Sequence, residues 1–168
     1  MNLYIVRHGE AAPLGGAVTR DADRPLTPRG EEDARLMGGA LTALGGNIGQ
    51  ILSSPLTRAV QTARLISSRL PGTPPVSTTT NLSPGFRPKA LLADLAAAAG
   101  MTGLILVGHQ PDLGELIAFL VGDGSGAGIA FPAGAAAKLS VTAGSPPRDA
   151  ALHWLLTPEA VRRLQSRN

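Results

Sequence analysis

Residue types that handle phosphoryl groups follow the apolar runs of this 168-residue chain. Arg7 and His8 come directly after a first apolar run, His109 comes one glycine after a later one, and Arg58 comes shortly after a third. A guanidinium binds phosphate oxygens through forked hydrogen bonds, and an imidazole can attack phosphorus. The four residues therefore predict a phosphate site with a histidine nucleophile.

The expected secondary structure brings these residues to one place. Apolar runs predict strands at residues 3–6, 48–53, 76–79, 104–107, 137–141 and 151–156. Helical patterns occupy residues 28–44, 55–70, 89–99 and 111–121, and a last one starts at residue 158. This alternation predicts an α/β fold, a three-layer α/β/α sandwich with a mainly parallel central sheet. Because ligands bind beyond the carboxyl ends of parallel strands, His8, Arg58 and His109 should meet at one edge of the sheet.

Three of the expected helices carry the same starting signal. Thr27-Pro28, Ser54-Pro55 and Thr157-Pro158 each place an N-cap side chain before a proline, which fits the first helical position. Ser54 lacks the G-x-S-x-G turn of a serine hydrolase, so we expect it to cap a helix.

Composition limits the class of protein. Hydrophobic residues make up 43% and charged residues 16%, which predicts one globular domain spanning residues 1–168. No apolar stretch approaches the roughly 20 residues of a membrane span. The sequence has no cysteine, which excludes disulfides, thiolate metal sites and a cysteine nucleophile and makes a cytoplasmic location the default. The arginines are scattered and aromatic residues are only 3%, so we expect neither nucleic acid nor membrane as a partner.

Three motifs in order resemble those of the histidine phosphatase superfamily, which includes the cofactor-dependent phosphoglycerate mutases and acid phosphatases. They are Arg-His-Gly-Glu at residues 7–10, Ser-Pro-Leu-Thr-Arg-Ala-Val-Gln-Thr at 54–62 and Val-Gly-His-Gln-Pro at 107–111. The short chain and Arg-Pro-Leu-Thr at 24–27 are most similar to the SixA-type phosphohistidine phosphatases. The resemblance covers about residues 3 to 121 and implies a phosphoglycerate mutase-like fold.

The resemblance also implies roles for individual residues. His8 would be the nucleophile, Arg7 and Arg58 would hold the phosphoryl group, and His109 would be a further donor to its oxygens. Arg24 matches an arginine that faces the phosphate in the short phosphatases, although it could instead pair with a nearby aspartate. Nearby cations disfavour imidazolium, so His8 should keep a free lone pair at pH 7. The sequence leaves open which ring nitrogen attacks.

One departure from the family concerns the proton donor. Many members carry a carboxylic acid between the second and third motifs, but residues 81–85 of this chain contain no carboxylate. Asp21, three residues before Arg24, is the expected substitute, and Asp23 is its rival.

These features predict a phosphohistidine phosphatase that acts in signal transduction on a phosphorylated protein, such as a histidine phosphotransfer domain. A broad phosphomonoesterase that acts on small phosphorylated metabolites is the second enzyme hypothesis, and a phosphate-binding pseudoenzyme is the non-enzyme alternative. We expect no cofactor and no metal, because arginines around His8 and His109 would repel a cation. A monomer is favoured over an oligomer.

Overall fold

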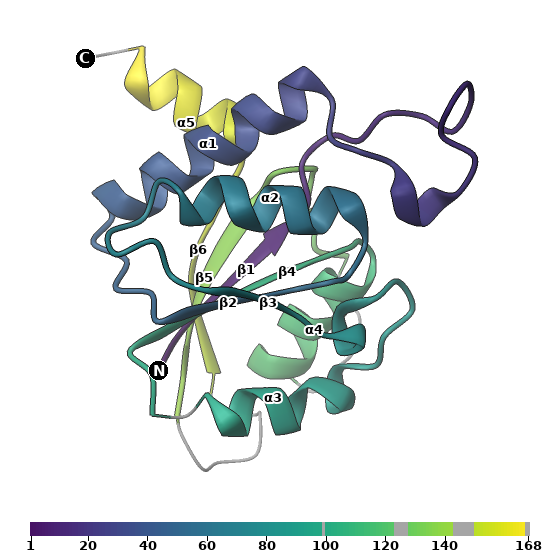
Figure 1. Ribbon diagram of the computed structural model, residues 1–168. Helices are drawn as coiled ribbons and strands as arrows, with labels where there is room; N and C mark the ends of the chain where they lie inside the picture. Colours follow the sequence, from purple (N-terminus) through teal and green to yellow (C-terminus); the bar gives the residue numbers. More distant parts are fainter. Residues whose placement is uncertain (99, 123–127, 143–149, 167–168) are drawn as a thin grey trace.

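A computed structural model describes residues 1–98, 100–122, 128–142 and 150–166. Its centre is a six-stranded sheet in the order β3-β2-β4-β1-β5-β6 (Figure 1). The strands are β1 (Asn2–Arg7), β2 (Gln50–Ser53), β3 (Val76–Thr78), β4 (Gly103–Gly108), β5 (Ala136–Val141) and β6 (Ala150–Leu156). Neighbouring strands from β3 to β1 are parallel, whereas β5 is antiparallel to both β1 and β6. Among the described strands only β5 runs against the rest, which confirms the mainly parallel sheet.

Helices cover both faces of the sheet (Figure 1). The helices α1 (Pro28–Ala43), α2 (Thr57–Ser67) and α5 (Pro158–Gln165) cover one face, and α3 (Leu92–Ala97) and α4 (Asp112–Val121) cover the other. Side chains of β1 point alternately into two apolar cores: Leu3 and Ile5 pack with the α4 side, and Tyr4 and Val6 pack with the α1 side. The predicted three-layer sandwich is therefore confirmed. No helix of the described part is long and apolar enough to cross a membrane.

The predicted helix starts are confirmed at two of three positions. Thr27 and Thr157 cap α1 and α5 by accepting hydrogen bonds from backbone N–H groups of the first turn. The third prediction is wrong, because α2 begins at Thr57 and its N-cap residue is Leu56. Ser54 lies before that helix, and its hydroxyl has other partners.

Three short 3-10 helices lie in the connections: η1 (Asp21–Asp23), η2 (Thr80–Leu82) and η3 (Pro88–Leu91). The helix predicted over residues 89–99 is divided between η3 and α3, and residue 99 itself lies outside the described residues. Of these elements η1 bears on the candidate site, because it contains Asp21 and lies against α2.

A close backbone contact fixes the loop after β1 against the start of α1. The N–H of Thr27 donates to the carbonyl of Glu10 over 2.9 Å. A Cβ on Gly30 would lie 2.1 Å from that carbonyl oxygen, and a Cβ on Gly9 would lie 2.6 Å from the carbonyl oxygen of Gly30. Only glycine fits at both positions, so the sequence allows the loop that follows Arg7 to pack directly on α1.

Candidate active site

The structure brings Arg7, His8, Arg58 and His109 together at the carboxyl edge of the sheet, as predicted. Arg7 is the last residue of β1, His109 follows β4 directly, and Arg58 lies in the first turn of α2. The backbone of His8 is held on two sides: its N–H donates to the carbonyl of Gly108, and its carbonyl accepts from an N–H in the segment before β5. The position of His8 is therefore set by strands on both sides of β1.

The contacts of His8 determine which ring nitrogen carries its proton. The Nδ1 atom lies 2.7 Å from the carbonyl oxygen of Gly9, which can only accept a hydrogen bond. The Nε of Arg58, which can only donate, lies 3.3 Å from Nε2 of His8. Both contacts are satisfied when Nδ1 is protonated and Nε2 keeps its lone pair. Nε2 is therefore the ring nitrogen that these contacts leave with a lone pair.

The surroundings of His8 keep it neutral. Burial lowers the pKa of His8 to about 4, and the positive charges of Arg58, Arg7 and Arg24 act in the same direction. The hydrogen bond to the Gly9 carbonyl opposes this effect without reversing it. At pH 7 Nε2 therefore keeps its lone pair, which accepts the hydrogen bond from Arg58 in the free protein.

His109 is the second imidazole of the site. Its ring centroid lies 5.0 Å from that of His8, and its Nε2 lies 2.8 Å from the Oγ of Ser54. Burial, followed by repulsion from His8 and Arg58, lowers the pKa of His109 to about 3. The ring is therefore neutral at pH 7 and has one N–H to offer.

Arg58 is buried and uses three N–H groups within the protein. Nε donates to His8, Nη1 donates to the backbone carbonyl of Asp21 over 2.7 Å, and Nη2 donates to its Oδ2 over 2.9 Å. The other carboxylate oxygen of Asp21 accepts from Nη1 of Arg24 over 3.0 Å. Asp21 therefore bridges two of the arginines predicted to bind phosphate.

This bridge changes the interpretation of Asp21. Hydrogen bonds from Arg24 and then Arg58 lower the pKa of its carboxyl group below the usual value. A carboxyl group with a lowered pKa is ionised at pH 7 and is a poor proton donor. The surroundings of Asp21 thus oppose the predicted role as general acid and favour a role in holding the arginines. Asp23, the rival, is exposed and pairs with Arg20 instead.

Arg24 pairs with Asp21, which was one of the alternatives that the sequence left open for it. Besides Asp21, it donates to the backbone carbonyls of Ala11 and Ala12, which lie in the loop between β1 and η1. Its charge still contributes to lowering the pKa of His8. Arg24 is therefore tied to the loop and lies near enough to act electrostatically at the site.

Two buried side-chain nitrogens near His8 have no protein partner. Among the described residues, the buried side-chain nitrogen and oxygen atoms without a hydrogen-bond partner are Nε of Arg7 and Nδ1 of His109. The Nη1 of Arg7 donates a hydrogen bond to the carbonyl of Phe131, which fixes the guanidinium. Buried polar atoms normally find partners, so nitrogens left without one near His8 are available to bind an anion wherever they carry a proton.

Two side chains that support the site were not recognised in the sequence. The Oγ1 of Thr62 accepts from the N–H of Gly9 over 3.0 Å and donates to the carbonyl of Arg58 over 2.7 Å. Ser54 binds His109. Both lie inside the second motif, and the spacing of four residues between Arg58 and Thr62 places them on one side of α2. This four-residue spacing was the signal in the sequence from which the role of Thr62 could have been inferred.

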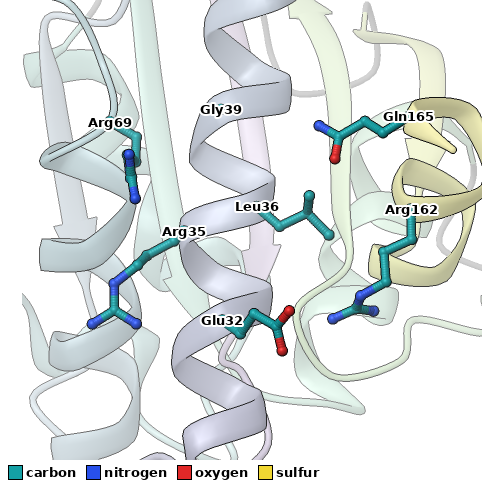
Figure 2. A pocket seen from close by; sticks show the side chains of 7 residues that line it. All are labelled: Glu32, Arg35, Leu36, Gly39, Arg69, Arg162 and Gln165. Carbon is teal, nitrogen blue, oxygen red and sulfur yellow. The ribbon is translucent and has the colours of Figure 1, made fainter. Parts of the chain in front are cut away.

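A groove of about 450 Å³ lies elsewhere, over the outer surface of α1. Figure 2 shows Arg35 and Arg69 on one side of α1, and Arg162 and Gln165 on the other. The lining also includes Glu32, Leu36 and Gly39, but no histidine. Because its lining includes none of Arg7, His8, Arg58 and His109, the groove is not the candidate active site.

Comparison with known proteins gives matches that agree with this geometry. A family model described as Histidine phosphatase superfamily (branch 1) matches residues 3–83. An uncharacterised protein of Picosynechococcus is 44% identical over 121 residues, which cover 68% of this chain and 70% of that protein. The phosphohistidine phosphatase SixA of Escherichia coli is 33% identical over 122 residues, which cover 71% of this chain and 74% of SixA.

A solved structure extends the similarity over nearly the whole chain. The structure of the protein histidine phosphatase SixA complexed with tungstate matches with a TM-score of 0.83 and 28% sequence identity. The match covers 94% of this chain and 97% of that one. The similarity therefore includes the region after residue 83, where His109 lies.

Proposed function

Because the chain belongs to the histidine phosphatase superfamily and is a phosphatase, we propose that it removes the phosphoryl group from a phosphohistidine side chain of another protein. Its similarity to SixA supports this substrate class. The observation that carries the proposal is the state of His8, whose Nε2 keeps a lone pair near two buried nitrogens that lack a protein partner.

In the first step, Nε2 of His8 attacks the phosphorus atom. A bond forms between Nε2 and phosphorus, and the bond between phosphorus and the substrate imidazole breaks. Arg58 releases its hydrogen bond to Nε2 and donates to a phosphoryl oxygen instead. Arg7 and His109 donate to the other oxygens through the N–H groups that are unpaired in the free enzyme. Such preorganised donors stabilise the charge of the transition state.

In the second step, water attacks the phosphorus of phosphorylated His8. The bond between Nε2 and phosphorus breaks, the water supplies the fourth oxygen of inorganic phosphate, and its proton passes to the phosphate or to solvent. His8 returns to the neutral form with its proton on Nδ1. The hydrogen bond from Nδ1 to the Gly9 carbonyl can persist through both steps, because Nδ1 stays protonated.

The leaving group explains how the site works without a dedicated acid. A phosphohistidine imidazole can take a proton from solvent near pH 7 and then leave as a neutral ring, whereas an alkoxide needs a proton from the enzyme. In the segment where many family members carry an acid, Asn81 donates to Asp94 and the N–H of Gly85 donates to Asp112. The carboxylates of Asp94 and Asp112 thus hold residues 81–85 in place.

Rates on three substrates test the proposal: a phosphorylated histidine phosphotransfer domain, p-nitrophenyl phosphate and an alkyl phosphate. We expect the highest kcat/KM on the phosphoprotein, and loss of turnover on all three in His8→Ala with an unchanged circular dichroism spectrum. Activity that survives in His8→Ala would refute the nucleophile. A higher kcat/KM on the alkyl phosphate would instead favour the metabolite phosphatase. The histidine phosphotransfer domain and the cytoplasmic location stay predictions.

A further inference from the structure

We propose that Ser54 is a positioning residue that sets the protonation of His109. Its hydroxyl group donates to Nε2 of His109, so the ring proton lies on Nδ1, where it is available to a phosphoryl oxygen. This inference rests on the proposed function, since it assigns the origin of one of the donors used there. It also replaces the predicted role of Ser54 as a helix cap.

The hydrogen-bond partners of Ser54 support this proton arrangement. The Oγ of Ser54 lies 3.3 Å from the backbone nitrogen of Leu56 and 2.8 Å from Nε2 of His109. The N–H of Leu56 can only donate, so the oxygen accepts there. The hydroxyl hydrogen then has one acceptor among the described contacts, which is Nε2 of His109.

The opposite arrangement would leave one more buried group unsatisfied and would put a lone pair on Nδ1. If Nε2 of His109 carried the proton, it would donate to Ser54, and the hydroxyl hydrogen of this fully buried residue would have no acceptor among the described contacts. Nδ1 of His109, already without a protein partner, would then present a lone pair. A lone pair cannot bind an anionic phosphoryl group, whereas an N–H can.

The position of Ser54 is fixed by the sheet. Its backbone N–H donates to the carbonyl of Val107 over 2.9 Å, so it lies beside the end of β4, two residues before His109. Its own carbonyl accepts from the hydroxyl of Ser53 over 2.8 Å. The hydroxyl of Ser54 therefore reaches His109 from a rigid part of the fold, as a positioning group should.

Nitrogen-15 NMR on the wild-type enzyme tests the inference without any activity measurement. At pH 7 we expect a neutral His109 ring with its proton on Nδ1. In Ser54→Ala, the proton should redistribute toward Nε2. A wild-type ring with its proton on Nε2, or an unchanged proton position in a folded Ser54→Ala, would overturn the inference. Because this readout needs no substrate, it separates failure of the inference from failure of the proposed function.

Kinetics on p-nitrophenyl phosphate give a second readout. Complete loss of such a donor costs on the order of 10²–10³ in rate, and Ser54→Ala loses it only partly, so we expect kcat to fall about tenfold with a smaller change in KM. Ser67→Ala is the matched control, because Ser67 is also buried, but its hydroxyl donates to the carbonyl of Pro74 and it lies at the far end of α2 from Arg58. It should keep kcat within about twofold and leave the proton on Nδ1. Equal losses in both variants would indicate a general packing effect and overturn the inference.

Discussion

At the scale of single residues, the free enzyme holds His8, the proposed nucleophile, in a resting arrangement. The hydrogen bond from Nε of Arg58 occupies the lone pair of His8 that must attack, while Asp21 occupies the two ends of the same guanidinium. An incoming phosphoryl group can replace the first of these contacts without disturbing the other two. Arg58 is thus already oriented before substrate arrives, which avoids reorganisation during the reaction.

The bridging role of Asp21 makes a prediction that differs from acid catalysis. Asp21→Asn should lower kcat/KM by a similar factor on phosphohistidine, p-nitrophenyl phosphate and an alkyl phosphate, because it weakens the support of Arg58 and Arg24. The loss should be roughly two- to fivefold, since an ion pair with an exposed partner is worth only about 0–1 kcal/mol. Rates on the three substrates provide the measurement.

Asp23→Asn is the matched control, because Asp23 lies on the same short helix but pairs with Arg20. It should leave all three rates nearly unchanged. A loss in Asp21→Asn that is 10²-fold or more on the alkyl phosphate and small on phosphohistidine would restore Asp21 as the proton donor.

The sequence predicted the site residues that follow strands, but not the hydrogen bonds between them. Arg7, His8 and His109 could be placed because the carboxyl ends of parallel strands share one edge. The state of Asp21 could not, since its pKa depends on two guanidinium groups brought to it by other segments. Ser54 was misassigned for the same reason: a cap signal is local, whereas its hydroxyl is bound by His109 from β4.

At the scale of elements, the start of α1 supports the loop that carries His8. Gly30 lies in the first turn of α1, and the carbonyl of Glu10 occupies the place where a Cβ would be. Local signals predicted this helix well, because Thr27-Pro28 defines its start through contacts within the helix itself. The contact with the loop after β1 joins residues that are distant in the sequence, so no local pattern indicated why residue 30 is glycine.

Gly30→Ala therefore should displace the loop next to His8. A methyl group 2.1 Å from a backbone oxygen forces the backbone apart, which should lower the free energy of unfolding by about 1–3 kcal/mol. Misplacement of His8 by about 1 Å can reduce kcat/KM by about 10²-fold. Urea unfolding and steady-state kinetics measure the two effects.

Gly39→Ala in the same helix is the control for helix propensity. No atom lies within 4 Å of a Cβ at that position, so the substitution should raise the free energy of unfolding by about 1 kcal/mol and leave kcat/KM unchanged. If Gly30→Ala were as stable and active as Gly39→Ala, the close contact would not support the site.

At the scale of the whole molecule, one sheet serves both stability and the site. The side chains of β1 alternate between two apolar cores, and the same strand ends in Arg7 at the edge where β4 delivers His109. Fixing the site in this way requires burial of both imidazoles, and burial opposes their protonation. The geometry that keeps His8 nucleophilic therefore makes the stability of the whole fold depend on pH.

The sign of this dependence follows from the two pKa values. The pKa values of His8 and His109 are lowered from 6.5 to about 4 and about 3, so between pH 6.5 and 4 the unfolded chain binds more protons than the folded one. The free energy of unfolding should therefore fall as the pH drops from 7 to 5, by about 2 kcal/mol for His8 and further for His109. The lowered pKa of Asp21 acts only below about pH 4.

Urea unfolding at pH 8, 7, 6 and 5 should show a constant midpoint between pH 8 and 7 and a falling one below, and His8→Gln should reduce that fall. A midpoint that stays constant down to pH 5 would mean that His8 accepts a proton in the folded protein, and the neutral nucleophile would have to be abandoned.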